Sequence, residues 1–363
     1  MSAFSHRFLC YSVFAFVLVL FFVLIHFQNE INKLRNDRQK YDLLIERYSQ
    51  RLNEDELKSE SIGDESENGA FAASVRNTGD DDTLIIYNRV PKTGSTSFMG
   101  IAYDLCKNNR FNVIHLNVSK NNHVLSLSDQ SRFVYNVSNW SERQPSLYHG
   151  HIAFIDFSKF GVRKKPIYIN IIREPLSRLV SYYYFLRFGD NFRPYVVRKR
   201  QGNKVSFDEC VERKERDCDP NNMWLQIPFF CGHSANCWIP GNEWALQEAK
   251  RNLIQHYLLV GVTEDIHAFI AILESTLPRF FKGATKLYEK GVKSHLRKTY
   301  NKLDPLPETV EKVKQSKIWR MEFEFYQFAL QQFHFVKQRT LISFDNLFKD
   351  KGNQFFYEKI RPR

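Results

Sequence analysis

The sequence predicts an α/β protein with three layers, α/β/α, around a central and mainly parallel sheet. Two segments, 83–90 and 165–172, are short runs rich in apolar and β-branched residues, which is typical of buried strands. Each is followed within a few residues by apolar positions at helical spacing, over 98–106 and 176–183. Strand, loop and helix repeated in this order build parallel sheets that helices cover.

Composition and charge narrow the class of protein. The chain has 363 residues, of which 43% are hydrophobic and 15% aromatic, so it is too apolar to be disordered overall. Its 52 Lys and Arg exceed its 40 Asp and Glu, a net charge of +12. The excess is uneven, because residues 54–82 carry a net −8 and residues 83–363 carry 43 basic and 26 acidic residues, a net +17. The body of the chain is therefore expected to bind an anionic partner.

A membrane anchor is predicted near the amino terminus. Residues 8–27 are 20 residues without Lys, Arg, Asp or Glu, and a helix of that length spans about 30 Å, the thickness of the hydrocarbon layer. A cleavable signal peptide has a shorter apolar core and a small-residue cleavage site, and neither is present. We expect a short cytoplasmic tail at 1–7 and a transmembrane signal-anchor at 8–27, although the flanking charges alone do not orient it.

A stalk and a linker are expected to follow the anchor. From Ile31 to Leu52, core positions alternate at spacings of three and four, with Arg38 in one of them. This predicts a helical or coiled-coil stalk over 28–53, and a solvated helix that does not self-associate is the alternative. Residues 54–82 are rich in acidic and small polar residues and predict a flexible linker. The remaining residues, 83–363, would form one catalytic domain.

Cysteines and glycosylation signals bear on the compartment. We pair Cys210 with Cys218 and Cys231 with Cys237 across two short loops, although four cysteines allow three connectivities. A zinc site is the alternative, but seven and five intervening residues are poor zinc spacings. Cys106 lies on an apolar helical stripe and is expected to be a buried free thiol. Disulfides indicate an oxidising compartment. Three sequons would then be glycosylation acceptors: Asn117, Asn136 and Asn139.

A loop rich in hydroxyl groups joins the first predicted strand to its helix. Residues 91–97 are PKTGSTS, and backbone N–H groups at the start of a helix point towards an anion placed there. A kinase-type loop has its Lys at the other end, beside the helix, and an ordinary helix cap needs only one hydroxyl. We therefore predict a site for a phosphate or sulfate group formed by Lys92, Thr93, Gly94, Ser95, Thr96 and Ser97.

A second anion contact is predicted where the second strand ends. Arg173 follows the strand, and Pro175 suits the first turn of the next helix. Ser181 lies on that helix, away from its apolar stripe. Arg173 and a helix hydroxyl can together hold a second phosphate. A surface salt bridge from Arg173 to Glu174 or Asp190 is the alternative.

Two histidines are candidates for a general base. His149 and His151 are separated by one residue, so in an extended segment they point to the same face. An imidazole whose pKa lies near neutrality suits proton abstraction. A zinc pair or two core histidines are the alternatives. No Glu completes a zinc-protease pattern and no carboxylate cluster suits Mg²⁺, so we expect no metal.

Short motifs in order along residues 83–363 resemble the heparan sulfate 2-O-sulfotransferases, a family of Golgi polysaccharide sulfotransferases. They are YNRVPKTGSTSF, YHGH, INIIREPLSRLVSYYYFLRFGD, WLQIPFFCGH, LVGVTE, LPRFF and SHLRKT. The loop at 91–97 is similar to the family's 5′-phosphosulfate loop, and Arg173 with Ser181 is similar to its 3′-phosphate motif. The resemblance implies a P-loop-like sulfotransferase fold and 3′-phosphoadenosine-5′-phosphosulfate as the sulfuryl donor.

The resemblance also implies roles for individual residues. His151 would be the base, with His149 in support, and Lys92 would neutralise charge on the bridging oxygen as the sulfuryl group leaves. Further donor contacts are implied for Tyr288, against the adenine, and for Ser294, Thr299 and Lys302. Acceptor contacts are implied for Arg89, Tyr103, Asn121, Asp190, Arg193, Arg198 and Arg297. Two departures from the family are Pro194-Tyr-Val-Val197, where vertebrate-like members have a denser Arg run, and Gly94, where Ala is common.

The charged body suggests a groove for a sulfated polysaccharide, because Arg pairs sulfate and carboxylate in a bidentate manner. A nucleic acid is the rival partner for a basic surface, but a lumenal domain would not meet one. The aromatic run from Trp319 to Phe333 could stack bases, yet on a long helix it is expected to be core or a subunit interface. The residues expected to line the groove are Arg89, Arg187, Arg193, Arg198, Lys199, Arg200, Lys204 and Arg297.

Together these features predict a sulfotransferase that modifies the 2-hydroxyl of hexuronic acid, mainly iduronate, in heparan sulfate. The family implies a single-pass type II protein of the Golgi membrane with a lumenal catalytic domain. It also implies a homotrimer in which residues 355–360 pack on a neighbouring subunit. The alternatives are a uronyl 2-O-sulfotransferase acting on dermatan or chondroitin sulfate and a non-catalytic heparan-binding lectin. The position of Lys92 argues against a P-loop kinase.

Overall fold

The computed structural model describes residues 82–119, 122–291, 298–344, 347–356 and 358, together with Gln28 and Asn32. The predicted anchor at 8–27 therefore lies outside the described residues, as do nearly all of the stalk and linker. None of the described helices is long and apolar enough to cross a membrane. The chain divides into two units, Met1–Val75 and Arg76–Arg363. The second unit contains the elements below.

The described residues of this unit form a five-stranded sheet in the order β2-β3-β1-β4-β5, and every pair of neighbours is parallel. A two-stranded antiparallel hairpin follows near the carboxyl terminus. The predicted α/β class with a parallel sheet is confirmed. The strands are β1 (Leu84–Asn88), β2 (Asn112–Leu116), β3 (Ser146–Gly150), β4 (Ile167–Ile172), β5 (Tyr257–Val262), β6 (Leu341–Phe344) and β7 (Leu347–Asp350).

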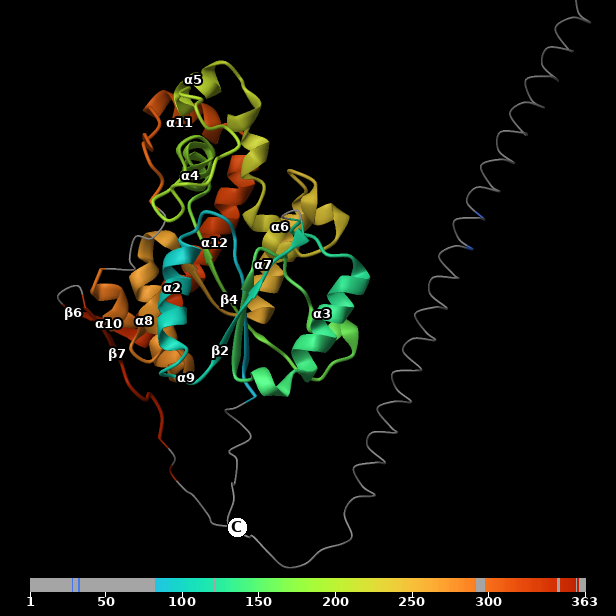
Figure 1. Ribbon diagram of the computed structural model, residues 1–363, viewed down its shortest axis with the longest axis vertical. Coiled ribbons are helices and arrows are strands. Elements are labelled where there is room, and N and C mark those ends of the chain that lie inside the picture. Colours follow the sequence, from blue (N-terminus) through green and yellow to red (C-terminus); the bar gives the residue numbers. More distant parts are fainter. Residues whose placement is uncertain are drawn as a thin grey trace, which may run out of the picture. The chain divides into compact units, whose positions relative to one another are not determined.

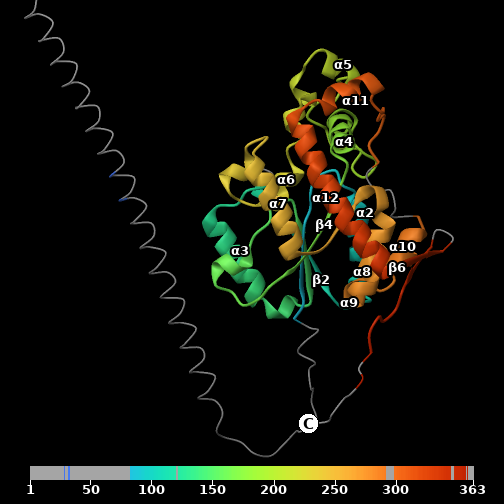
Figure 2. The same cartoon turned by 180° about the vertical axis from the view of Figure 1, so that it is seen from behind.

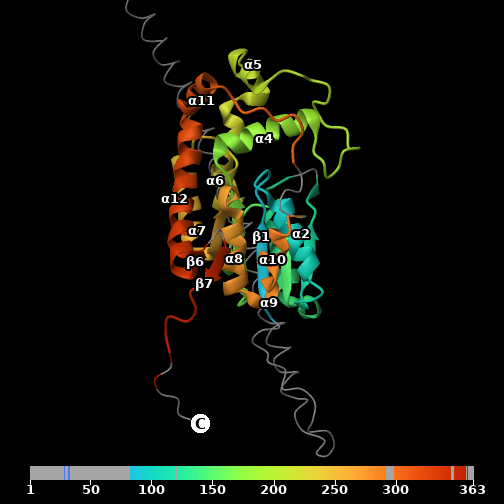
Figure 3. The same cartoon turned by 90° about the vertical axis from the view of Figure 1, so that its left-hand side faces the viewer.

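Helices cover the sheet on both faces and at one end. Figure 3 shows the strands between α12 and α7 on one side and α2 on the other. Figures 1 and 2 show α4, α5 and α11 together at one end of the molecule. The α-helices are α2 (Ser95–Leu105), α3 (Leu127–Asn139), α4 (Pro175–Phe188), α5 (Phe207–Glu212), α6 (Gln226–Cys231), α7 (Glu243–His256), α8 (Ile266–Thr276), α9 (Pro278–Phe281), α10 (Ala284–Glu289), α11 (Pro307–Lys314) and α12 (Lys317–Thr340).

The two units predicted from sequence are β1 with α2 and β4 with α4. All five residues of β1 are buried, as a central parallel strand requires. In α4, Pro175 occupies the first turn, and the Glu174 carboxylate accepts hydrogen bonds from the backbone N–H groups of Leu176 and Ser177. This cap fixes where the helix begins, just after Arg173. Because parallel strands end at one edge of the sheet, the two loops lie together.

A buried polar network holds the central strands in register. Asn170 on β4 donates from Nδ2 to the carbonyl and the side-chain oxygen of Asn88 on β1, at 2.8 and 2.9 Å. The Tyr257 hydroxyl on β5 donates to the same Asn88 oxygen at 3.0 Å, and Asn88 donates to the Phe229 carbonyl. Each buried polar side chain thereby has a partner. The network ends one residue before Arg89.

The long helix α12 contributes to the core. Its buried positions include Ile318, Met321, Phe325, Ala329 and Phe333, spaced three to four residues apart along one face. The same helix contacts β5, α4 and α7. The aromatic run therefore belongs largely to the core of the domain, which was one of the two outcomes expected from sequence.

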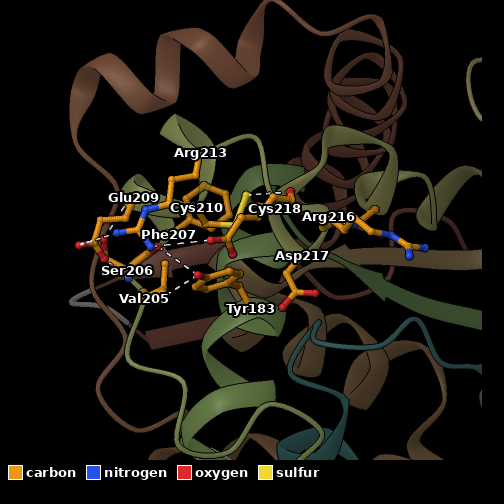
Figure 4. The surroundings of a disulfide bond; sticks show 12 residues. Tyr183, Val205, Ser206, Phe207, Glu209, Cys210, Arg213, Arg216, Asp217 and Cys218 are labelled. Atoms are coloured by element: carbon orange, nitrogen blue, oxygen red, sulfur yellow. Dashed lines mark hydrogen bonds and ion pairs between the residues drawn. A yellow bond between two sulfur atoms is a disulfide. The ribbon is translucent and has the colours of Figure 1, made fainter.

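Both predicted disulfides are present in the structure. Cys210 is joined to Cys218, and Cys231 is joined to Cys237. The first links α5 to the short 3-10 helix Arg216–Cys218, and Figure 4 shows it beside Phe207 and Tyr183. Ser206 and Glu209 form a capping box at the start of α5. Cys106 is a free thiol, but it is half-buried rather than fully buried as expected.

Candidate active site

The loop after β1 has the geometry of an anion site. Gly94 caps α2 with φ of +76°, a left-handed conformation that favours glycine. Ser95, Thr96 and Ser97 then form the first turn of the helix, so their backbone N–H groups stand at the positive end of the helix dipole. The Thr93 hydroxyl is buried and donates to the Val90 carbonyl at 2.9 Å. This hydroxyl shapes the loop rather than facing outwards.

Lys92 takes an unusual backbone conformation in this loop. Its φ is +68°, which is uncommon for any residue other than glycine and costs about 1–3 kcal/mol. Its ammonium donates to the Thr299 hydroxyl at 3.1 Å and lies 4.3 Å from the centre of the Phe185 ring. The strained turn therefore directs the Lys92 side chain across the loop towards α4 and residue 299.

Arg173 is held beside the same loop. Its backbone N–H donates to Gln226 Oε1, and its carbonyl accepts from Gln226 Nε2, both at 2.9 Å. Its guanidinium donates to the Lys92 carbonyl at 3.5 Å. The Arg173 Nε atom is buried and makes no hydrogen bond within the described part of the chain. Ser181 is buried on α4, two turns after Arg173. The two predicted anion motifs thus meet at one edge of the sheet.

The two histidines lie at the end of β3. His149 faces His115 of β2 across the sheet, and their rings stack with centres 4.7 Å apart. A Cβ added to Gly150 would meet Leu116 atoms at 2.8 Å, so only glycine fits between the two histidines. His149 is buried, and His151 is half-buried. The residue between the two histidines must therefore be glycine, because β2 approaches β3 closely at this point.

Arg89 joins both imidazoles. Its Nη2 atom donates to His151 Nε2 at 2.9 Å, and its Nη1 atom donates to His149 Nδ1 at 3.2 Å. Arginine is a donor only, so these two ring nitrogens are the unprotonated ones. The opposite nitrogens then donate, His151 Nδ1 to the Arg89 carbonyl at 2.8 Å and His149 Nε2 to the Tyr103 hydroxyl at 2.9 Å. The contacts of Arg89 therefore fix the tautomer of each ring.

These contacts change the basicity of the pair. Burial, and next the positive charge of Arg89, lower the pKa of His149 and of His151 to about 3. From sequence, a base with a pKa near neutrality is expected. In this arrangement that expectation is wrong, because a guanidinium lies against each ring. Both imidazoles are neutral at pH 7.

Three acceptor residues predicted from sequence lie just after the end of α4, namely Asp190, Arg193 and Arg198. Asp190 is buried, and its carboxylate accepts from the backbone N–H groups of Phe192 and Arg193 at 3.2 and 3.0 Å. It also pairs with Arg198 at 3.7 Å. Arg193 is exposed, and Tyr103 is 47% exposed. Asp190 thus holds the backbone that carries the two arginines.

One residue of the predicted groove is placed elsewhere. Arg187 is fully buried, pairs with Asp217 at 3.0 Å, and lies 3.5 Å from the centre of the Tyr183 ring. Its assignment to a polyanion groove is wrong, because its charge is used inside the fold. Arg200 is exposed but shares the same Asp217 carboxylate. The positions of the basic residues in the sequence do not distinguish an inward-facing Arg187 from outward-facing ones.

The remaining predicted residues are partly described. The Thr299 hydroxyl accepts a hydrogen bond from Lys92, and its backbone forms an isolated β-bridge with Asp190. Lys302 forms an ion pair with Asp304 at 3.2 Å. Tyr288 on α10 stacks on His267, with ring centres 5.4 Å apart. Asn121, Ser294 and Arg297 lie outside the described residues. Within the described part of the chain, no group of three His, Cys, Asp or Glu is arranged to hold a metal ion.

Three side chains at the site were not predicted. Phe185 lies beneath both Lys92 and Arg198, with their charges 4.3 and 4.4 Å from its ring centre. His115 stacks on His149, and Gln226 holds the Arg173 backbone. Phe185 follows Ser181 by one helical turn, and that spacing is the sequence signal that could have found it. The other two depend on strand register and on a long-range contact.

Comparison with known proteins shows the family of the chain. A family model described as the sulfotransferase family matches residues 77–329, and the chain belongs to this family of enzymes. It is similar to heparan sulfate 2-O-sulfotransferase 1 of Gallus gallus, 54% identical over 347 residues, which are 96% of this chain and 95% of the relative. The Homo sapiens protein of the same name is 51% identical over 357 residues, 97% of this chain and 95% of the relative. A heparin sulfate O-sulfotransferase of Drosophila melanogaster is 60% identical over 280 residues, 77% of this chain and 79% of the relative.

Proposed function

We propose that the protein transfers a sulfuryl group from 3′-phosphoadenosine-5′-phosphosulfate to the 2-hydroxyl of hexuronic acid, mainly iduronate, in heparan sulfate. One observation carries this proposal. Arg89 lies three residues before Lys92 of the anion loop, and its guanidinium contacts His151. A candidate base and a candidate anion site are therefore neighbours along one edge of the sheet. The names of the relatives supply the acceptor.

The donor fits the residues present. The α2 N-terminus and Lys92 suit a sulfuryl group next to a phosphate, and the buried Arg173 Nε offers a hydrogen bond that no described residue takes. When bound, the donor supplies an activated sulfuryl group whose loss leaves adenosine 3′,5′-bisphosphate. Lys92 is placed to neutralise negative charge that grows on the leaving oxygen. Neutral hydroxyls on the first turn of α2 add hydrogen bonds.

His151 is the proposed base. Its Nδ1–H is held by the Arg89 carbonyl, so Nε2 is the nitrogen that can accept a proton. Removing the proton from the acceptor hydroxyl makes its oxygen nucleophilic towards sulfur. His149 is fixed between Arg89, Tyr103 and His115. It therefore supports the position of Arg89 and is itself out of reach of the acceptor.

The acceptor side is basic, with Arg193 exposed and Arg198 half-buried. Arg193 and Arg198 extend from a loop that the buried Asp190 holds, and they suit the sulfate and carboxylate groups of a polysaccharide. Arg198 and Lys92 share the Phe185 ring. The ring thereby holds the acceptor-facing cation close to the donor-facing cation.

We also propose the cellular setting expected from sequence. A single-pass type II Golgi membrane protein with a lumenal, glycosylated catalytic domain is supported by two disulfides and by the exposure of Asn117, Asn136 and Asn139. A homotrimer with the tail at 355–360 against a neighbour is proposed from family resemblance. Phe355 and Phe356 are 64% and 86% exposed, as such a contact would need.

Transfer of labelled sulfate tests the function. The purified protein should label heparan sulfate at least about tenfold faster than dermatan or chondroitin sulfate, which corresponds to about 1.4 kcal/mol of discrimination. The opposite preference would identify a uronyl 2-O-sulfotransferase. Binding of adenosine 3′,5′-bisphosphate by calorimetry excludes the heparan-binding lectin, since a lectin has no use for the nucleotide site. Transfer to neither polymer would contradict the proposal.

A further inference from the structure

We propose that Arg89 is a removable cap on the base, and that the carboxylate of the acceptor uronic acid uncovers His151 by drawing the guanidinium away. This inference rests on the proposed function, because it assumes that His151 accepts the proton of a hydroxyl on an acidic sugar. It adds a reason why the acceptor must be acidic.

Arg89 acts as a cap because it takes up the hydrogen-bonding capacity of the His151 ring. The ring has two nitrogens, and both are engaged. Nδ1–H donates to the Arg89 carbonyl, and Nε2 accepts from Arg89 Nη2. An acceptor hydroxyl must form its hydrogen bond to that same Nε2 lone pair before it can lose a proton. Arg89 therefore has to leave Nε2 before the reaction can begin.

The geometry allows the side chain to leave while its backbone stays. The Arg89 N–H donates to the Gly150 carbonyl at 2.8 Å, and the Arg89 carbonyl accepts from His151. Both backbone groups are thus tied to the end of β3. Arg89 is half-buried, so its guanidinium is within reach of a ligand. A swing of the side chain would leave His151 with the correct tautomer and a bare Nε2.

The carboxylate is the group that suits this displacement. A neutral imidazole nitrogen accepts a single hydrogen bond from a guanidinium, whereas a carboxylate accepts two parallel ones and adds opposite charge. A hexuronic acid carries its carboxylate on the same ring as the 2-hydroxyl. The group that attracts Arg89 and the group that needs His151 therefore arrive together. A neutral sugar of the same shape would leave the cap in place.

Uncapping also makes His151 a stronger base. Among the residues that the structure describes, the charged or titratable groups that act on it are Arg89 after β1, His149 on β3, His115 on β2 and His123 before α3. Of these, Arg89 is the only permanent cation. Burial is the largest cause of the low pKa of His151, and the charge of Arg89 is the next. Pairing that charge with a carboxylate removes this second cause and raises the pKa.

Titration of His151 by NMR tests the cap without turnover. The full chain is labelled at its histidine rings, the His151 signal is assigned with His151→Gln, and adenosine 3′,5′-bisphosphate fills the donor site. Between pH 5 and 8, His151 should stay neutral in the absence of acceptor. Completely desulfated, N-resulfated heparin oligosaccharide should bring its titration midpoint into this window. The carboxyl-reduced oligosaccharide, which keeps its sulfates, should not.

Two variants sharpen the result. In Arg89→Met, His151 should titrate at a higher pH even without acceptor, and Arg132→Met, an exposed arginine on α3, is the matched control that should leave it unchanged. Equal shifts from the carboxylated and reduced oligosaccharides, or a wild-type titration in Arg89→Met, would overturn the proposal. A folded Arg89→Met is established by unchanged signals of His233 and His256, whose titration does not depend on Arg89.

Kinetics give a second readout that a purely structural Arg89 would not move. The wild type should prefer the carboxylated oligosaccharide over the reduced one by about 100-fold, the lower range of general-base effects. Arg89→Met should be slower on the carboxylated oligosaccharide but should discriminate less than about tenfold. Retention of the wild-type ratio by Arg89→Met would contradict the cap. If no transfer occurs at all, the proposed function fails, while the titration still decides whether Arg89 caps His151.

Discussion

At the scale of single residues, the site is built around Arg89 and Phe185, each of which contacts two functional side chains. Arg89 bridges His149 and His151, and Phe185 lies under Lys92 and Arg198. Neither residue has an ionisable or nucleophilic role of its own in the reaction. Their function is to set the position and the charge environment of the residues that do. This arrangement leads to two predictions at the residue scale.

Replacing His151 by Ala should abolish transfer while leaving nucleotide binding close to wild type. Loss of a general base lowers the rate by about 10²–10⁴. The hydrogen bonds described for the His151 ring go to Arg89 and not to the loop at 91–97. The turnover number is measured with labelled donor, and adenosine 3′,5′-bisphosphate binding is measured by calorimetry. A variant that sulfates at the wild-type rate would remove His151 from the role of base.

Replacing Phe185 by Leu should weaken the binding of both substrates. Each cation over the ring contributes about 0.5–1 kcal/mol, so the KM for donor and the KM for acceptor should each rise about two- to fivefold. Phe185→Tyr keeps the ring face and serves as the matched control. Unchanged KM values for both substrates in Phe185→Leu would show that the ring does not position Lys92 and Arg198.

Residues whose chemistry is rare and whose neighbours are local stand out most clearly in the sequence. The loop at 91–97 and the His149–His151 pair are distinguished by residue type and local spacing, and the structure places both at the same edge of the sheet. Arg187 shows the limit, because its burial against Asp217 depends on a contact 30 residues away. His115 was missed for a similar reason, since only the register between β2 and β3 brings it to His149.

At the scale of elements, the α5 region depends on a covalent link. The Cys210–Cys218 bond closes a short loop between α5 and the 3-10 helix Arg216–Cys218, and both cysteines are buried. Asp217, one residue before Cys218, holds Arg187 from α4 and Arg200. The disulfide thus helps to position Asp217, and Asp217 connects the end of α4 to the loop that carries Arg193 and Arg198.

Removal of this disulfide should destabilise the domain and loosen the acceptor loop. Cys210→Ser with Cys218→Ser frees the unfolded chain from this loop closure, and the conformational entropy that it regains favours unfolding by about 2.5 kcal/mol. A lower midpoint of thermal unfolding is expected, together with a higher KM for the acceptor and little change in the KM for the donor. The single variant Cys106→Ser is the control, because Cys106 is a free thiol. An unchanged midpoint in the double variant would contradict the prediction.

Element types were more predictable than element boundaries. The predicted strands at 83–90 and 165–172 are shorter in the structure, Leu84–Asn88 and Ile167–Ile172, because the bounds of a strand follow from its pairing with neighbouring strands. The start of α4 was predictable, since Pro175 can occupy only the first turn. The order of the strands was not, because it depends on long-range pairing that periodicity does not encode.

At the scale of the whole molecule, buried neutral histidines make the fold sensitive to acid. Burial lowers the pKa of His233 to about 4, and burial with Arg89 lowers those of His149 and His151 to about 3. The unfolded chain binds protons at these residues below about pH 6.5, whereas the folded chain does not. The free energy of unfolding should therefore be largest above pH 6.5 and decrease as the pH falls towards 4 and then 3.

Urea unfolding at a series of pH values measures this decrease. Each such histidine contributes up to about 1.4 kcal/mol for every pH unit below 6.5. His233→Asn places an amide oxygen where Nδ1 accepts the hydrogen bond from the Leu125 N–H, so it should fold and show a shallower decrease than the wild type. A wild-type stability that is constant from pH 7 to pH 5 would contradict the burial of neutral imidazoles.

The central claim is that the two halves of the site together sulfate one position on one sugar. The most direct measurement is disaccharide analysis after transfer to completely desulfated, N-resulfated heparin. The account predicts that new sulfate appears on the 2-hydroxyl of the uronic acid, mostly iduronate, and that His151→Ala yields none. Sulfate found on the glucosamine instead, or equal products from His151→Ala, would contradict it.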